Sequence, residues 1–281
     1  MKGDFFMKKM ACFWKSLLPM IFLFILQVVA TIPVMIIFAL KDSSAAGGDI
    51  AAILGSLSDI TSNQQYLQTV NIVYGILALL VFGIWYQRVF VRPFRNRPKK
   101  QPTGYSFHTI VSMIFLGIGL QYVTTLLIGR LRPEWITKYN ATMETQGYSD
   151  LSVMLIVYSL ILAPIIEELI FRGLIFRYAR HAMPFWFANI WQALLFGFVH
   201  LNLVQGIYAF AMGLFLGWVC RRGHGIRYSI PVHIVFNIIG CFFSGLISIS
   251  LMFSYVGFAV FGVVLTIFAL WLFYTDFQTA E

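Results

Sequence analysis

Residues 160–172 read LILAPIIEELIFR, an apolar run with two adjacent carboxylates that ends at an arginine. An ionisable group inside a membrane costs at least ~2.5–3.5 kcal/mol on insertion scales, so such groups usually have a function or a partner. Arg172 follows Glu168 by four residues, so the two share a helix face and can pair. Glu167 is rotated by about 100° from Glu168 on a helix of 3.6 residues per turn. We therefore predict that Glu168 bonds to Arg172 and that Glu167 points at something else.

The rest of the chain has the composition of a membrane protein. Of its 281 residues, 59% are hydrophobic and 11% are charged, whereas a soluble globular protein has roughly 25% charged residues. A helix needs about 20 apolar residues to cross a bilayer, and no segment alternates in polarity as barrel strands would. We predict an all-α fold, a polytopic membrane helix bundle of about eight transmembrane helices. The expected spans are 17–40, 69–91, 107–128, 151–171, 184–200, 203–220, 229–249 and 252–274.

The basic residues predict an orientation for this bundle. With the N-terminus inside, the inside segments contain 16 Lys and Arg residues and the outside segments contain 4. This asymmetry is typical of cytoplasmic loops, so we expect a multi-pass plasma-membrane protein with both termini in the cytoplasm. The net charge of +9 is then topological, with some attraction to anionic lipid. We expect the lipid bilayer as a partner and no nucleic acid.

Two parts of the chain are expected. Residues 1–103 contain two spans and a basic, proline-containing linker over 92–103. Residues 104–281 contain the other six spans. Within them, residues 213–217 read GLFLG, a G-x-x-x-G pattern that indicates close packing between helices. Three scattered cysteines, Cys12, Cys220 and Cys241, exclude a disulfide framework and a cysteine-based metal site.

Two histidines and an asparagine are candidates to meet Glu167. His200 ends one apolar run, and His233 opens another, with Asn237 one helical turn later on the same face. A lone histidine in a membrane helix more often forms a hydrogen bond between packed helices than takes part in chemistry. Here the polar groups come from three separate runs, and each would carry its own desolvation cost unless they converge.

A convergent site of this kind predicts peptide-bond hydrolysis. A carboxylate beside a neutral imidazole can hold a water and remove its proton. A second imidazole and a carboxamide can donate to the oxyanion that forms on the attacked carbonyl. A zinc site with two histidines and one glutamate is the alternative, although the H-E-x-x-H spacing is absent. There is no G-x-S-x-G of a serine hydrolase either.

Three motifs in order resemble the CPBP family of intramembrane proteases. This family includes the CAAX prenyl endopeptidases and the bacteriocin-processing or immunity proteins of the Abi group. The resemblance covers about residues 150–245. The motifs are E-E-x-x-x-R at Glu167, Glu168 and Arg172, F-x-x-x-H at Phe196 and His200, and H-x-x-x-N at His233 and Asn237.

The resemblance implies a role for each motif residue. Glu167 and His200 would activate the water, and His233 and Asn237 would stabilise the oxyanion. Glu168 and Arg172 would have supporting roles, and Phe196 would be a packing residue. Family members have been described both as metalloproteases and as metal-independent glutamate proteases, so the cofactor stays open. A metal such as zinc, if present, would be bound by Glu167, His200 and His233.

The substrate class follows only in outline. We expect a peptide or protein, such as a prenylated tail, a leader peptide or a pheromone precursor. Two other functions remain open: a non-catalytic membrane immunity or partner protein of the same fold, and a transporter with the glutamate pair as a proton relay. Against a transporter, the sequence has no internal repeat of the kind that many transporters show.

The expected spans place the candidate residues at different depths. Glu167 and His233 lie towards the inside face, whereas His200, about 16 residues into an outward-going helix, would be about 24 Å across at 1.5 Å per residue. The three side chains cannot meet in this arrangement. Either the helix after Arg172 runs back into the membrane, or the 184–200 span is tilted and starts deep, or the span limits differ.

Overall fold

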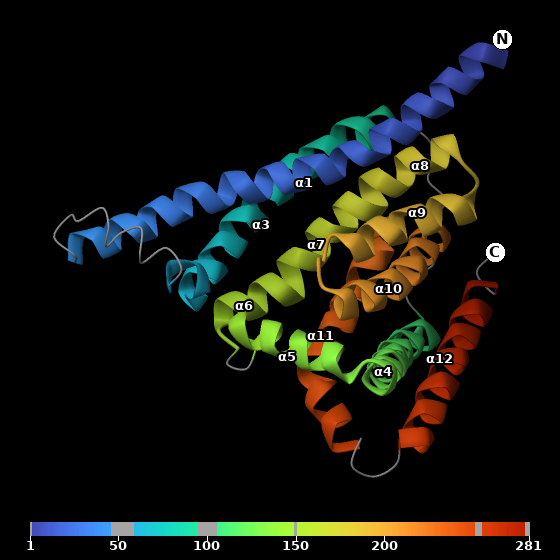
Figure 1. The fold of residues 1–281 in the computed structure, drawn as a ribbon. Coiled ribbons are helices and arrows are strands. Elements are labelled where there is room, and N and C mark those ends of the chain that lie inside the picture. Colours follow the sequence, from blue (N-terminus) through green and yellow to red (C-terminus); the bar gives the residue numbers. More distant parts are fainter. Residues whose placement is uncertain (1, 46–58, 95–105, 149–150, 251–254, 279–281) are drawn as a thin grey trace.

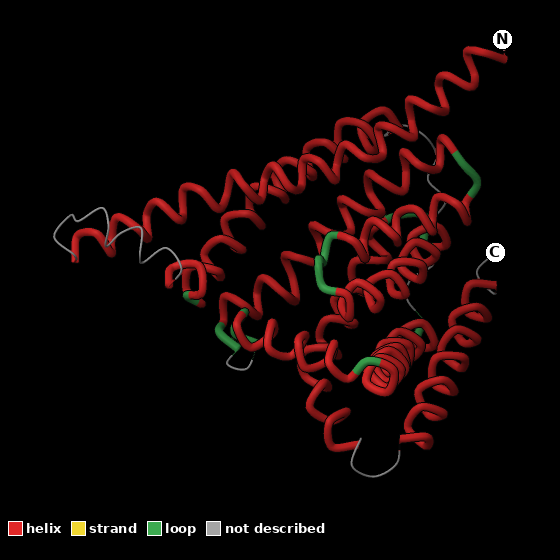
Figure 2. Tube along the Cα trace, viewed as in Figure 1, coloured by secondary structure: helices red, strands yellow, loops and turns green. Residues whose placement is uncertain are grey.

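The computed structural model describes residues 2–45, 59–94, 106–148, 151–250 and 255–278, and within these residues helices are joined by short turns and loops without any strand (Figures 1 and 2). Its long helices are α1 (Lys2–Ala45), α3 (Gln64–Tyr86), α4 (Phe107–Leu131), α9 (Phe185–Phe198), α10 (Leu203–Arg222), α11 (Ile226–Ser250) and α12 (Tyr255–Gln278). The shorter α5 (Pro133–Thr145) follows α4, and α3 continues into the π-helical η1 (Gln87–Val91) and the 3₁₀-helical η2 (Arg92–Phe94).

The motif E-E-x-x-x-R lies on a helix assembled from five consecutive segments. These are α6 (Val153–Val157), η3 (Tyr158–Leu162), α7 (Ala163–Glu167), η4 (Glu168–Ile175) and α8 (Phe176–Ala182). The segments η3 and η4 are π-helical and flank α7, which begins with Pro164 in its first turn. Proline has no N–H to donate to the preceding turn, and π-turns are a common way to accommodate such an interruption near functional sites.

The polytopic membrane bundle is confirmed. Within the described residues, five helices are long and apolar enough to cross a membrane: Phe6–Lys41, Gln64–Val91, Phe107–Leu131, Val153–Ala182 and Leu203–Arg222. Three further apolar helices are shorter: Phe185–Phe198, Ile226–Cys241 and Val260–Leu272. Each of these eight segments overlaps one of the eight expected spans.

The fourth span differs from the expected one in its end point. The sequence predicted an end at residue 171, whereas the helix continues to Ala182. The expected limit was wrong because Arg172 was taken as the polar end of the run. In the structure Arg172 is buried and paired with Glu168, so its charge does not need to lie at the membrane surface.

The helices pack around the segment that carries the two glutamates. The α1–α3 pair lies along α8 and η4 on one side, and the α9–α10 hairpin and α11 lie on the other (Figure 1). A second pair, α4 and α12, packs beside α11. The predicted boundary between residues 103 and 104 lies outside the described residues, so the two-part division stays a prediction.

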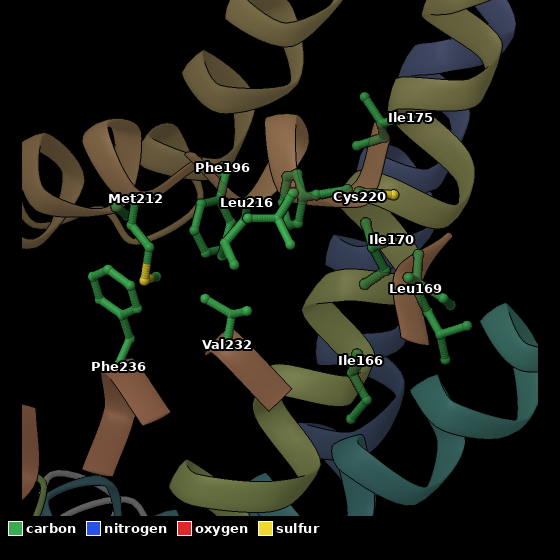
Figure 3. Close-up of a cluster of buried hydrophobic side chains, with 14 of the residues drawn as sticks. Ile166, Leu169, Ile170, Ile175, Phe196, Met212, Leu216, Cys220, Val232 and Phe236 are labelled. Carbon is green, nitrogen blue, oxygen red and sulfur yellow. The ribbon is translucent and has the colours of Figure 1, made fainter. Parts of the chain in front are cut away.

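An apolar core holds the site-bearing helices in place. Figure 3 shows side chains of the α7–η4 segment facing those of α9, α10 and α11. They include Ile166, Leu169 and Ile170 on one side, and Phe196, Met212, Leu216, Val232 and Phe236 on the other.

The predicted close packing at G-x-x-x-G is confirmed between α9 and α10. A Cβ on Gly213 would lie 3.0 Å from the Ala193 Cα atom, and a Cβ on Gly217 would overlap the Asn189 side chain. Only glycine therefore permits this approach of the two helices.

Candidate active site

A buried ion pair forms the centre of the candidate site. The Arg172 Nη1 atom lies 2.7 Å from Glu168 Oε1, and both side chains are 0% exposed. The four-residue spacing brings the two groups onto one face, as the sequence predicted. A charge at this depth is tolerated only when it is paired and hydrogen-bonded.

His233 of α11 lies between the two carboxylates. Its Nδ1 atom is 3.0 Å from Glu168 Oε1, and its Nε2 atom is 3.3 Å from Glu167 Oε2. The rotation between the two glutamates therefore directs them to opposite nitrogens of one imidazole ring. One imidazole ring thus contacts both carboxylates, and the guanidinium of Arg172 contacts Glu168.

The members of this cluster differ in their access to solvent. The Glu167 side chain is 26% exposed, whereas that of His233 is 1% exposed and those of Glu168 and Arg172 are fully buried. Only the second Glu167 oxygen, Oε1, lacks a protein partner while lying on a side chain that is open to its surroundings.

Phe196 connects the buried pair to both histidines. The Arg172 guanidinium lies 4.5 Å from the centre of the Phe196 ring, a distance at which the cation is attracted by the ring face. The His200 and His233 rings meet the same phenyl ring edge-on, with centroids 5.1 and 5.7 Å away. Phe196 is fully buried, so one buried ring contacts the guanidinium and both imidazoles.

His200 lies just after the end of α9, and its orientation is set by the helix. Its Nδ1 atom is 2.8 Å from the Phe196 carbonyl oxygen. Since a carbonyl only accepts, Nδ1 carries the proton and Nε2 of the neutral ring is left as an acceptor. The structure gives His200 contacts with Phe196 and no direct hydrogen bond to Glu167.

The longer fourth span removes the discrepancy in depth. The α8–α9 turn is centred on residues 183–184. Glu167 precedes this turn by about 16 residues and His200 follows it by about 16 residues, which places each about 24 Å along its helix. The helix after Arg172 continues away from the site to this turn and does not run back, so the error lay in the expected span limit.

Asn237 contacts a different part of the site from the one expected. Its Nδ2 atom donates to the Ser159 carbonyl oxygen at 2.8 Å, in the π-helical η3. A carboxamide nitrogen has two N–H groups, so one donor of Asn237 remains for another acceptor. The bond to Ser159 ties α11 to the helix that carries Glu167.

Two buried amides near the site were missed by the sequence reasoning. Gln192 Nε2 donates to the Gly213 carbonyl at 2.8 Å and to Asn189 Oδ1 at 2.9 Å, and Asn189 Nδ2 donates to the Leu214 carbonyl at 2.9 Å. Arg172 Nη2 approaches the same Gly213 carbonyl at 3.4 Å. The signal was available, because Asn189 and Gln192 are polar residues three apart inside an apolar run. Asn237 was the one non-ionisable polar residue inside an apolar run that the sequence prediction considered.

Tyr148 in the turn after α5 also lies near the carboxylates. Burial raises the pKa of the Tyr148 phenol to about 12, and nearby Cys241 and Glu167 add smaller contributions in the same direction. The phenol is therefore neutral at physiological pH. It is a potential hydrogen-bond donor near Glu167 that the sequence did not indicate.

The side chains considered for a metal ion do not form a ligand set as they stand. Within the part of the chain that the structure describes, no three His, Cys, Asp or Glu side chains are grouped to hold a metal. Both ring nitrogens of His233 already face carboxylates, and Nδ1 of His200 is bonded to a carbonyl. Zinc binding by Glu167, His200 and His233 would require the contact between Glu167 and His233 to open.

Comparison with known proteins finds one family model and one relative. Residues 149–239 match the family model described as "Type II CAAX prenyl endopeptidase Rce1-like", and this range contains all three motifs. The predicted resemblance to the CPBP proteases is confirmed. The chain is also 33% identical over 84 residues to "Putative membrane peptidase YdiL" of Bacillus subtilis (strain 168), and these residues make up 30% of this chain and 34% of that protein. The chain thus aligns with about a third of this relative's length, and no solved structure matches it.

Proposed function

We propose that this multi-pass membrane protein is a CPBP-type endopeptidase that hydrolyses a peptide bond with an activated water. The observation that carries the proposal is the difference in exposure within the charged cluster. Glu167 is 26% exposed, while its partner His233 is 1% exposed. A base must reach its water, and Glu167 is the carboxylate of the cluster that can.

The proposed base is Glu167 together with His200. Glu167 Oε2 is held by His233, so Oε1 is the atom that accepts the proton of the water. His200 presents Nε2 as an acceptor because its Nδ1 is fixed on the Phe196 carbonyl. Glu167 would later return the proton to the leaving amine, which leaves the enzyme in its starting state.

The proposed oxyanion donors are His233 and Asn237. Glu168 accepts from Nδ1 of His233 at 3.0 Å and thereby fixes the ring, and Arg172 holds Glu168 in turn. An N–H at Nε2, which faces Glu167 Oε2 at 3.3 Å, would then be shared with the developing oxyanion. Asn237 would add its second N–H. Each such donor is worth about 10²–10³ in turnover.

The location of the site limits the kind of substrate. Glu167 lies near the middle of the 30-residue span Val153–Ala182, so the scissile bond must enter the bundle rather than remain at its surface. A prenylated tail, a leader peptide or a pheromone precursor could meet this requirement if its cleavage site is extended. A plasma-membrane location with both termini in the cytoplasm completes the proposal.

An unbiased cleavage assay tests this function. Membrane fractions would be incubated with the purified full-length chain or its E167Q variant in liposomes, and new peptide termini would be identified by mass spectrometry. We expect cleavages that E167Q lowers by about 10²–10⁴, the usual contribution of a general base. Glu134→Gln is the matched control, because Glu134 lies on α5 and is exposed. Equal cleavage by wild type and E167Q would contradict the proposal and favour a non-catalytic partner protein.

A further inference from the structure

A second group of charged residues lies at the end of the bundle where α8 turns into α9 and α10 ends. Arg180 of α8 and Arg221 of α10 both lie against the ring of Phe185, with guanidinium carbons 5.9 and 4.2 Å from its centre. Phe185 is the first residue of α9. Two cations from different helices therefore converge on one ring. Figure 1 shows α8 and α9 reaching this end beside the N-terminal part of α1.

The same arrangement recurs on the neighbouring face of α8. Arg177 lies 5.1 Å from the Tyr86 ring and 5.6 Å from the Phe90 ring, which belong to α3 and η1. Arg88 and Arg92 are exposed on η1 and η2. Aromatic faces attract guanidinium groups and restrict their positions. At this end of the bundle, Arg177, Arg180 and Arg221 are thus restricted by aromatic rings, and Arg88 and Arg92 add exposed charge.

No carboxylate balances these charges among the side chains that the structure describes. The acidic side chains that the structure describes are those of Asp59, Glu134 and Glu144, near the start of α3 or on α5, and those of Glu167 and Glu168 in the candidate site. The contacts of Arg180 and Arg221 are with Phe185 and, for Arg180, with the Met183 carbonyl oxygen at 3.1 Å. Both arginine residues are exposed.

We propose that Arg180 and Arg221, supported by Arg177, bind the phosphate headgroups of anionic phospholipids. Guanidinium groups match phosphate oxygens in geometry and charge, and the cytoplasmic leaflet is the membrane surface that carries net negative lipid charge. A general inside-positive bias requires only basic residues in the loops. It gives no reason for two guanidiniums to share one ring.

Lipid binding at this end would act on the helices that carry the candidate site. The two arginines belong to α8 and α10 and meet on α9. A headgroup bridging them would therefore hold three helices together. Of these, α8 is continuous with the segment that carries Glu167, and α9 carries Phe196. This inference depends on the charges and contacts at the basic end and holds whether or not the chain is a peptidase.

The test is the lipid dependence of thermal unfolding in the purified full-length protein. The protein in an uncharged detergent would be titrated with phosphatidylglycerol, with phosphatidylcholine of the same acyl chains, and with glycerol phosphate as the water-soluble headgroup. We expect phosphatidylglycerol to raise Tm, and the other two to have little effect. In R180Q/R221Q the apparent affinity for phosphatidylglycerol should fall about 25-fold, because each basic residue near an anionic surface contributes about fivefold.

The control is Arg132→Gln, since Arg132 lies on an aromatic ring as well but is paired with Glu134. This variant should keep the full response to phosphatidylglycerol. A rise in Tm that is equal for both lipids, or a loss in R132Q as large as in R180Q/R221Q, would overturn the proposal. A rise with glycerol phosphate that matches phosphatidylglycerol would also overturn it in favour of a soluble anion. If R180Q/R221Q fails to fold, R180K/R221K provides the same comparison. We expect its apparent affinity for phosphatidylglycerol to be several-fold weaker than that of the wild type. An unchanged affinity would contradict the role of the planar guanidinium groups.

Discussion

Replacing Arg172 by methionine should reveal how strongly the buried cluster depends on its one fixed cation. Arg172 is fully buried, contacts Glu168 at 2.7 Å and lies 4.5 Å from the Phe196 ring centre. Arg172→Met leaves the Glu168 carboxylate buried with no guanidinium. Breaking such a pair costs about 3–5 kcal/mol, and the lost contact with the ring adds about 0.5–2 kcal/mol. We therefore expect the free energy of unfolding to fall by about 3.5–7 kcal/mol.

A double variant separates the ion pair from the rest of the site. E168Q/R172M removes both charges and keeps an acceptor oxygen for His233 Nδ1. Buried pairs can often be replaced by neutral groups at little cost, so most of the lost stability should return. Activity should stay lower than wild type by about tenfold, since a neutral acceptor holds the His233 ring about 1.4 kcal/mol less tightly than a carboxylate.

Unfolding in mixed micelles with increasing SDS, followed by tryptophan fluorescence, would measure both variants. Arg132→Met is the matched control, because the Arg132–Glu134 pair is 3.8 Å apart and about three-fifths exposed; its effect should stay below about 1 kcal/mol. If R172M were as stable as this control, the buried pair would not hold the cluster. If E168Q/R172M regained full turnover, Glu168 would have no role in positioning His233.

Three further outcomes are expected. Gly217→Ala should destabilise the protein by about 1–3 kcal/mol through overpacking, because the new methyl group would overlap Asn189. Gly83→Ala is the control, because no atom lies within 4 Å of a Cβ at that position. In the same SDS titration the control should be neutral or slightly stabilising. Asn237→Ala should lower turnover by about 10²–10³ with little change in substrate affinity; a change in affinity alone would instead indicate a role in substrate binding. A chelator should leave cleavage unchanged, because His233 faces carboxylates through both nitrogens, and a loss of cleavage that zinc reverses would show that these contacts open for a metal.

The sequence predicted the membrane bundle because hydropathy is a local property. Eight apolar runs are visible without knowledge of their neighbours, and G-x-x-x-G indicates close packing by composition alone. The end of the fourth span was missed because Arg172 has its counter-charge inside the bundle, which hydropathy does not register. The amphipathic α5 was also missed, since it has no buried residue and follows α4 after one residue.

The sequence was enough to predict the residues of the candidate site, but not which of their side chains contact one another across helices. The four-residue spacing was enough to pair Glu168 with Arg172 and to separate Glu167 from them. The convergence of both glutamates on His233 depends on how α11 packs against η4, which no local pattern specifies. The link from Asn237 to the Ser159 carbonyl depends in the same way on the π-helical turn of η3.

The position of His200 follows from two constraints that act at opposite ends of α9. The two-residue turn after Ala182 places Glu167 and His200 at equal distances along adjacent helices, so both reach the same depth only with a short turn. The amides of Asn189 and Gln192 then fix α9 against successive carbonyls of α10, Gly213 and Leu214. A shift of one residue in α9 would rotate Phe196 by about 100° away from Arg172 and move both histidine contacts with it. Gly213 and Gly217 of α10 are therefore part of the geometry of the candidate site, although neither has a side chain that could take part in the chemistry.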